Sequence, residues 1–391
     1  MFSTVSRTAT RNTVNPGIRR VMVLDPIGHV LGSHDHAICS ELAGLGCEVR
    51  LGTHPENPFG RDSSPYRRQD TWRGVVGTRS RVMKTLSWFR ALGRIMGEVR
   101  SWRPDVVFLY YSLQPGLDRL LLRRLAAANV RTILAVHDVT PLDAAPSTDA
   151  AWRRLYHTPD RIMAFSEFSR REIIERMGVD SDRVGVAYLG VANVESPGMD
   201  IRSARRRVGA SEQEELVLCF GQIKSNKGLD HLIEGFASVA AERPRAHLRV
   251  VGLPRIDMTR FHEMVAALGL DDRVTFLSER VPEEQVIPWL TAADVVVMPY
   301  TRLYQSAVIT QASALGRPMI ATRVGSFPEL IEDGRTGWLV DPGDARALSG
   351  ALLDALGDQA RAERRGELAR QDLVQRCSWG ALAQRLLEVA E

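Results

Sequence analysis

Short apolar runs alternate with longer helical stretches along the whole chain, and this alternation constrains the fold more than any other feature. The apolar runs are rich in β-branched residues and do not alternate apolar with polar positions, as expected of strands buried on both faces. Parallel strands joined by covering helices have this property. The sequence therefore predicts an α/β protein with mostly parallel sheets.

The predicted strands fall into two sets, and at 391 residues the chain is long enough for two domains with a core each. The predicted strands of the first half are Arg20–Leu24, Glu48–Gly52, Asp105–Leu109, Arg131–Val136, Arg161–Ala164 and Val184–Ala187. Those of the second half are Leu216–Phe220, His247–Val251, Val274–Leu277, Val295–Pro299, Pro318–Thr322 and Gly337–Val340.

A linker is predicted at Gly190–Glu214, which lacks apolar periodicity and contains Pro197, Gly198 and many charges. We expect a first domain over residues 19–192, a second over 215–376, and a final helix over 377–391 that packs back toward the first domain. Ligands of such domains bind at the carboxyl ends of the strands, so a cleft there is the expected site.

Composition narrows the cellular setting. No apolar run reaches the roughly 18 residues that a membrane span needs. The four cysteines have no metal-ligand spacing, which favours a reducing, cytoplasmic location. Residues 1–195 hold 27 Lys+Arg against 20 Asp+Glu (+7), and the remainder holds 24 against 27 (−3). An anionic partner is therefore expected to meet the first half.

One segment has the properties of a diphosphate-binding loop. It runs from Phe220 to Asp230, follows a predicted strand directly and opens a predicted helix. Gly221 lets the backbone approach a ligand closely, and the helix start offers unpaired N–H groups to an anion. Lys224 and Lys227 add positive charge. The alternative is a basic helix start that faces solvent; the GKS/GKT ending of a Walker loop is absent.

A second segment follows the strand that ends at Pro299. Ser306 is predicted to be the N-cap of a helix that stops near Gly316, which leaves the N–H groups of Ala307 and Val308 free for a phosphate. Gln311, one turn further along, is within reach of a ribose hydroxyl.

These segments and three later runs together resemble the donor half of glycosyltransferase family 4. The later runs are Arg317–Thr322 (RPMIAT), Gly325–Ile331 (GSFPELI) and Asp333–Val340 (DGRTGWLV). The first half is similar more loosely, through Gly28–His36, His137-Asp138 and Ser166–Ser169. The resemblance implies a GT-B fold, in which two Rossmann-like domains face each other across a cleft. It also implies a nucleoside-diphosphate sugar donor, no metal at the diphosphate, and retention of the anomeric configuration.

The resemblance assigns the site residues. Catalysis is expected of His137, Lys224 and Lys227, although His137 alternatively pins a loop. Acceptor binding is expected of Gly28, Gly32 and His34 in a glycine-rich loop. The expected donor-binding residues are Gly221, Gln222, Lys224, Lys227, Gln305, Ser306, Ala307, Val308 and Gln311.

The chain departs from the common family pattern at three positions. One is Gln222, where the common pattern has arginine; a subset of the family has its basic residue at the position of Lys224 instead. The usual pair of glutamates falls on Leu303 and Gln311, and neither is acidic. In a subset of the family the loop reads QSGV without the first glutamate, and Gln305–Val308 (QSAV) resembles it. The departures motivate an alternative, a catalytically degenerate protein that binds nucleotide sugar or glycan without transfer. A sugar-nucleotide epimerase of GT-B fold fits the motifs less well.

Two possible metal sites are discounted. Asp180-Ser181-Asp182 matches a manganese-binding DxD pattern but lies in a polar turn, where Asp and Ser are ordinary. The cluster of His29, His34, Asp35 and His36 follows the first predicted strand, in a glycine-rich loop at the start of a helix. This position favours a loop that faces the acceptor over a metal site. We expect no metal and no cofactor other than the donor substrate.

A basic amphipathic helix is predicted over Arg81–Arg103, with Trp88 and Trp102 as residues for a membrane interface. The ordinary alternative, a sheet-covering helix with solvent-facing arginines, is favoured. Together these features predict a retaining hexosyltransferase acting on a glycan, lipid-linked or small-molecule acceptor, with peripheral contact with the inner face of an anionic membrane as an option. No nucleic-acid partner is expected. The base, the sugar, the acceptor, the linkage and the oligomeric state are left open.

Overall fold

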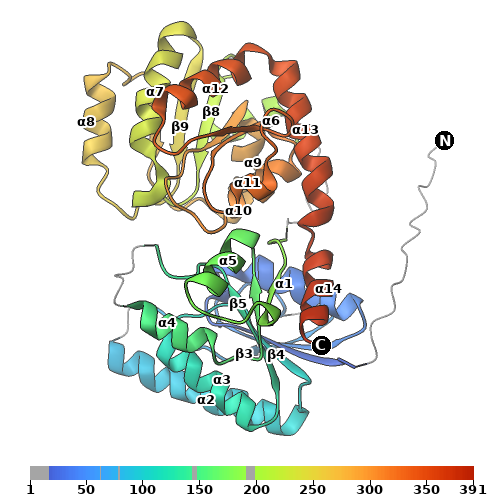
Figure 1. Cartoon of the computed structure of the whole chain (residues 1–391). Helices are drawn as coiled ribbons and strands as arrows, with labels where there is room; N and C mark the ends of the chain where they lie inside the picture. Colours follow the sequence, from blue (N-terminus) through green and yellow to red (C-terminus); the bar gives the residue numbers. More distant parts are fainter. Residues whose placement is uncertain (1–16, 62, 78–79, 143–147, 191–198) are drawn as a thin grey trace, which may run out of the picture. The chain divides into compact units, whose positions relative to one another are not determined.

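The computed structural model of the chain (Figure 1) describes residues 17–61, 63–77, 80–142, 148–190 and 199–391, without the side chains of residues 29–31. Contacts divide the chain into two compact units. The first comprises the described residues up to Leu134 together with Thr158–Arg161 and Ala383–Glu391, and the second comprises those of Ala135–His157 and Ile162–Leu382. No described helix is both long and apolar enough to span a bilayer.

The first sheet has seven strands in the order β3-β2-β1-β4-β5-β6-β7, and its described pairings are parallel. Its strands are β1 Arg20–Asp25, β2 Glu48–Thr53, β3 Arg67–Asp70, β4 Val106–Leu109, β5 Arg131–Val136, β6 Arg161–Ala164 and β7 Val184–Val186. The predicted parallel α/β architecture is confirmed, and the predicted strand ends lie within one residue of the observed ones.

The second sheet has six parallel strands in the order β10-β9-β8-β11-β12-β13. They are β8 Glu215–Phe220, β9 Ala246–Val251, β10 Val274–Leu277, β11 Val295–Met298, β12 Met319–Thr322 and β13 Trp338–Val340. Along β8, Val217 and Cys219 pack into one apolar core while Leu218 and Phe220 pack into another. The sheet is therefore buried on both faces, which explains why its strands are continuous apolar runs.

Helices connect most of the strands, as Figure 1 shows, and in the order of the described elements β3 follows β2 without one. Among the described residues the α-helices are α1 Gly28–Gly44, α2 Arg81–Trp102, α3 Pro115–Ala127, α4 Asp149–Tyr156, α5 Glu167–Glu175, α6 Ile201–Val208, α7 Leu229–Glu242, α8 Thr259–Ala267, α9 Glu283–Ala292, α10 Ala307–Ala314, α11 Phe327–Leu330, α12 Ala345–Gly357, α13 Gln359–Arg376 and α14 Trp379–Val389. The chain's last residues belong to the first unit, where the Arg131 guanidinium donates to the carbonyl of Ala390.

Strand order places a topological switch point in each sheet. In the second sheet the chain leaves β8 toward β9 and β10 and then returns to β11 on the other side of β8. In the first sheet β1 and β4 have the same relation. The loops that leave such neighbouring strands diverge and leave a crevice, where ligands of doubly wound folds bind.

The predicted linker contains a helix that the sequence did not reveal. Residues 191–198 lie outside the described part of the chain, but Ile201–Val208 form α6, which packs on α9. Arg205 of α6 is 6% exposed, and its guanidinium lies 2.5 Å from Asp294 Oδ2. Asp294 also accepts a hydrogen bond from the N–H of Leu216.

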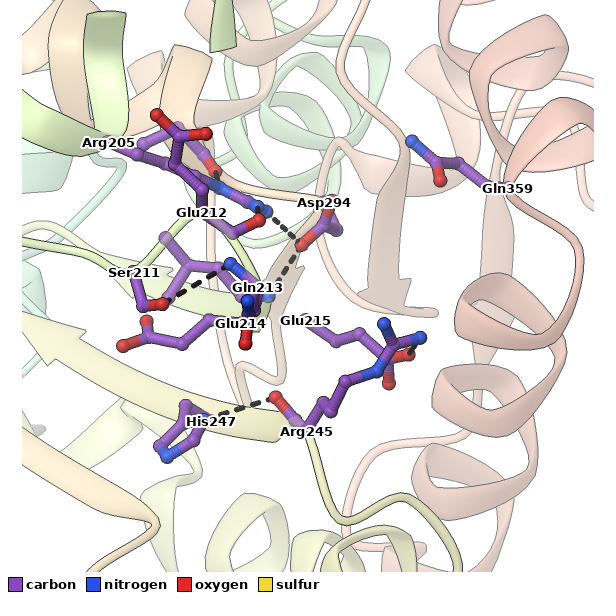
Figure 2. A network of polar contacts seen from close by, with 12 residues as sticks. Arg205, Ser211, Glu212, Gln213, Glu214, Glu215, Arg245, His247, Asp294 and Gln359 are labelled. Atoms are coloured by element: carbon purple, nitrogen blue, oxygen red, sulfur yellow. Dashed lines mark hydrogen bonds and ion pairs between the residues drawn. The ribbon is translucent and has the colours of Figure 1, made fainter. Parts of the chain in front are cut away.

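This ion pair belongs to a polar network at the amino ends of the strands of the second sheet (Figure 2). A cavity of about 360 Å³ lies there. Glu215 accepts two hydrogen bonds from Arg243, at 2.8 and 2.9 Å, and one from Arg245 at 3.0 Å. Opposite charges are thus largely paired at this edge, which is the edge away from the crevice of the switch point.

Candidate active site

The loop after β8 wraps around the side chain of Lys227. Gly221 has a φ of 100° and Gly228 a φ of 67°, both in the left-handed region that glycine tolerates. A Cβ atom on Gly228 would lie 2.0 Å from the carbonyl oxygen of Pro299, so only glycine fits there. Between the two glycines, Ser225–Lys227 form a 3₁₀ turn (η3) that leads into α7.

Lys227 is 2% exposed, and its ammonium donates to the carbonyl of Phe220 at 2.5 Å and to the hydroxyl of Tyr300 at 2.8 Å. Burial lowers the pKa of Lys227, but its interactions with Tyr300 and Cys219 outweigh this and raise the pKa above its ordinary value. The ammonium is therefore charged at neutral pH. Two of its three N–H donors are used by the protein.

The loop after β11 meets the loop after β8. The N–H of Thr301 donates to the carbonyl of Asn226 at 2.9 Å, and the Asn226 amide donates to the carbonyl of Arg302 at 2.6 Å. A Cβ atom on Gly221 would lie 3.5 Å both from Lys227 Nζ and from a methyl carbon of Val308. The structure thus brings Gly221, Lys227 and the start of α10 together at the switch point.

Ser306 is the N-cap of α10, as predicted, and its hydroxyl accepts from the N–H of Val308 at 3.2 Å. The expectation that the Val308 N–H is free for a phosphate is wrong in this structure, because the cap uses it. The amide oxygen of Gln305 is buried and has no hydrogen-bond donor among the described residues. Gln311 is half-buried in the second turn of α10.

Leu303 is 6% exposed and packs in the apolar core beneath the loop. A Cβ atom on Gly325 would lie 2.2 Å from the carbonyl oxygen of Leu303, so the two segments touch through their backbones. The residue that replaces the first family glutamate is therefore a packing residue in this chain.

Within the second unit, the end of β5 lies near Lys224. His137 is 9% exposed, and its ring centroid lies 4.6 Å from that of Phe165. Burial raises the pKa of the neighbouring Asp138, and the positive charge of Lys224 partly opposes this. Lys224 itself is half-buried, whereas Gln222 is exposed.

Glu329 connects two of the family-like runs. Its carboxylate accepts from the N–H groups of Glu167 at 2.8 Å and Phe168 at 2.6 Å, which are the first two residues of α5. The hydroxyl of Tyr188 lies 3.3 Å from the same carboxylate. A negatively charged acceptor at a helix N-terminus satisfies orphan N–H donors and is attracted by the positive end of the helix dipole. Sequence reasoning missed this cap because the two runs are separated by more than 150 residues.

In the first unit, Gly28 and Gly32 lie in the first two turns of α1, not in a loop as predicted. A Cβ atom on Gly28 would lie 1.9 Å from Thr53 Oγ1, and one on Gly32 would lie 2.7 Å from Asn57 Oδ1. Glycine is required at both positions because the helix packs closely against the end of β2 and the turn after it. His34 Nδ1 lies 3.3 Å from the hydroxyl of Tyr110, and burial lowers the pKa of His34 to about 4.

Beneath these glycines lies a buried pair of carboxyl groups that sequence reasoning missed. Asp35 Oδ2 accepts from Thr53 Oγ1 at 3.0 Å and from the Asn57 amide at 2.9 Å, while Asp25 Oδ1 accepts from the N–H of Ile27 at 2.8 Å. The other two carboxyl oxygens are buried and find no N–H or O–H donor in the described part of the chain, and each carboxyl affects the pKa of the other. A single proton held between the two carboxyls would give both oxygens a partner.

Comparison with known proteins decides the family. Residues 214–358 match the family model described as glycosyl transferases group 1, and residues 32–193 match the one described as glycosyltransferase family 4. The chain is 32% identical over 298 residues to a D-inositol 3-phosphate glycosyltransferase of Corynebacterium aurimucosum, covering 72% of this chain and 70% of the relative.

The chain belongs to glycosyltransferase family 4.

A more distant sequence relative and two solved structures are also similar to this glycosyltransferase. An N-acetyl-alpha-D-glucosaminyl L-malate synthase of Bacillus anthracis is 24% identical over 288 residues, 73% of this chain and 74% of the relative. HepE of Anabaena in complex with UDP and glucose superposes with a TM-score of 0.73 at 19% identity, covering 94% of this chain and 98% of that one. WaaG, a glycosyltransferase involved in lipopolysaccharide biosynthesis, gives 0.66 at 17% identity over 95% and 99%. The GT-B fold is thereby confirmed.

The residues of the two discounted metal signals lie in separate parts of the first sheet's domain as ordinary turn and helix residues. Asp180 precedes the 3₁₀ turn Ser181–Arg183 (η2), which contains Asp182. In the histidine cluster, Asp35 pairs with Asp25, and His36 Nδ1 lies 2.9 Å from the hydroxyl of Tyr66. The His29 side chain lies outside the described structure.

Proposed function

We propose that this glycosyltransferase moves a hexose from a nucleoside-diphosphate sugar to an acceptor hydroxyl with retention of the anomeric configuration. The convergence of Gly221, Lys227 and the start of α10 at the switch point between β8 and β11 carries this proposal. A small backbone, a charged ammonium and a helix N-terminus together suit a diphosphate.

The lysines have different roles in this proposal. Lys227 is buried beneath the loop and fixes the carbonyl of Phe220 and the hydroxyl of Tyr300, so one N–H remains for a phosphate oxygen. Lys224 is half-buried, and its ammonium is the more accessible of the two. Both stabilise the charge that grows on the diphosphate as its bond to the anomeric carbon breaks. No bound metal is needed for this.

The transfer step needs no nucleophile from the protein. The acceptor oxygen forms a bond to the anomeric carbon on the face from which the diphosphate leaves, and the acceptor proton passes to an oxygen of the departing phosphate. We propose that the buried His137 lines the sugar pocket, and that the unpaired amide oxygen of Gln305 accepts from a donor hydroxyl. The alternative of binding without transfer is not favoured, because the lysines are present and the named relatives are glycosyltransferases.

On the acceptor side, we propose that a glycan, lipid-linked or small-molecule acceptor meets the first unit near Gly28, Gly32 and His34, at the switch point between β1 and β4. The cysteines are all free and buried, which supports a reducing, cytoplasmic location. Peripheral contact with the inner face of an anionic membrane is part of the proposal.

Donor hydrolysis in the absence of acceptor tests the donor site. UDP-glucose is the first donor to try, because the related HepE structure holds UDP and glucose, followed by GDP- and ADP-sugars. Lys224→Ala should lower the hydrolysis rate at least tenfold, as expected for a charge removed from the developing diphosphate. Arg245→Ala is the matched control, because it removes a cation at the opposite edge of the sheet. Equal rates for the two variants would overturn the assignment.

A further inference from the structure

Exposed apolar side chains gather at the start of α2. Six large apolar side chains in the described part of the chain are exposed, and four of them lie within the first nine residues of this helix. They are Val82 at 69%, Met83 at 42%, Leu86 at 48% and Phe89 at 49%. Soluble surfaces rarely concentrate such residues without a binding role.

These residues form a second apolar stripe on α2. Val82, Leu86 and Phe89 follow helical spacing and share one face. The face that packs on the protein is a different one, and it buries Ser87, Trp88, Ala91, Ile95, Val99 and Trp102. A sheet-covering helix needs only the buried face, so the outer stripe is not explained by folding.

The prediction that Trp88 and Trp102 sit at a membrane interface is wrong. They are 3% and 5% exposed, and Trp102 Nε1 donates to Glu48 Oε1 at 2.7 Å. Trp102 also lies 4.4 Å from the guanidinium carbon of Arg50. The residues of this helix that could insert into a membrane interface are therefore those of the outer stripe, Val82, Leu86 and Phe89.

The charge around the stripe has one sign. Arg81 and Arg90 lie within the same turns as the stripe, Lys84 lies on the opposite side of the helix in line with Trp88, and the first acid of the helix is Glu98. None of the three cations forms an ion pair with another residue that the structure describes. Arg81 and Arg90 are exposed. Unpaired cations around exposed apolar residues match a surface of anionic headgroups above an apolar layer.

We propose that the first turns of α2, with Val82, Met83, Leu86 and Phe89 flanked by Arg81 and Arg90, dock on an anionic lipid bilayer. A second copy of the chain is a poorer occupant, because a twofold contact through this patch would bring the like charges together. The inference deepens the proposed function, on which its acceptor half rests. Docking by the unit that is expected to bind the acceptor favours an acceptor displayed at the membrane.

Vesicle flotation tests the docking surface with the full chain. The wild type should float with phosphatidylglycerol–phosphatidylcholine vesicles at low salt and at least tenfold less with phosphatidylcholine alone. Leu86→Glu combined with Phe89→Glu should lower flotation at least tenfold. The matched control is Leu268→Glu, another exposed leucine (42%) in the other unit, which should float like the wild type. Circular dichroism should show the same helix content in each protein.

Three results would overturn the proposal: a wild type that ignores anionic vesicles at low salt, a double variant that floats like the wild type, or a dimer that the double variant dissociates. Hydrolysis of a soluble donor such as UDP-glucose should be unchanged in the double variant. Failure of docking with intact hydrolysis would therefore refute the membrane surface alone, and absent hydrolysis with intact docking would refute the proposed function alone.

Discussion

The buried carboxyls of Asp25 and Asp35 should make the stability of the first unit depend on pH, with one proton held between them. Burial raises the pKa of Asp25 from 3.8 to about 6. Burial, followed by the negative charge of Asp25, raises the pKa of Asp35 well above its ordinary value. In the unfolded chain both carboxyls release their protons near pH 4. Folding therefore takes up protons above that pH, and the stability present below pH 4 is lost as pH rises through the folded-state pKa values.

Asp35→Asn should remove the part of this dependence that comes from Asp35, while burial still raises the pKa of Asp25. The amide oxygen still accepts from Thr53 and Asn57, and the amide N–H₂ donates to Asp25 at every pH. Above its unfolded-state pKa, Asp35 in the folded wild type holds a proton that the unfolded chain has lost, because burial and the charge of Asp25 raise its pKa. The stability of the wild type relative to Asp35→Asn should thus fall as the pH rises, by at most about 1.4 kcal/mol per pH unit.

Urea unfolding followed by far-ultraviolet circular dichroism at pH 6, 7 and 8 measures this difference. Glu56→Gln, which neutralises an exposed carboxylate in the same unit, is the control and should track the wild type. A difference between the wild type and Asp35→Asn that stays constant or grows with pH would refute the shared proton.

Three further perturbations probe the second unit. Lys227→Met leaves the carbonyl of Phe220 and the hydroxyl of Tyr300 without their buried donor. The free energy of unfolding in urea should therefore fall by about 1–3 kcal/mol, and the rate of donor hydrolysis should fall at least tenfold. A near wild-type rate of hydrolysis would contradict the role of Lys227. In Glu329→Gln only one of the two N–H groups at the start of α5 keeps its acceptor. The free energy of unfolding in the same assay should therefore fall by about 1–2 kcal/mol. An unchanged unfolding midpoint would contradict the cap. EDTA should leave donor hydrolysis intact, whereas a loss restored by added metal would revive a metal site.

The strands of the two sheets could be predicted from the sequence because strands that are buried on both faces are continuous apolar runs. β3 escaped detection for the opposite reason. It is the edge strand Arg67–Asp70, its sequence is RRQD, and it pairs with β2 alone. α6 escaped because its buried face rests on Ala204 and on Arg205, whose charge is neutralised by Asp294. A buried arginine looks like a surface residue until its partner, 89 positions away, is known.

The candidate site was predictable to the extent that its residues are local. The loop with Gly221, Lys224 and Lys227 and the cap at Ser306 are consecutive motifs, and the structure assembles them as strand-end loops. The carboxylate cap of Glu329 and the pair of Asp25 and Asp35 depend on residues that only the tertiary fold brings together. From the motifs we expected Gly28 and Gly32 to bind the acceptor. In the structure these glycines allow α1 to pack closely against Thr53 and Asn57.

The stereochemistry of the first product tests the central claim most directly. Proton NMR during hydrolysis of a UDP-α-hexose, recorded before mutarotation equilibrates the sugar, distinguishes the anomer released by the enzyme. A retaining glycosyltransferase with its donor on the loop of Lys224 and Lys227 should release the α-anomer first, and Lys224→Ala should slow that signal at least tenfold. Release of the β-anomer first would contradict retention. Saturable binding of nucleotide sugars from the uridine, guanosine and adenosine series without any turnover, with or without acceptors, would contradict transfer itself.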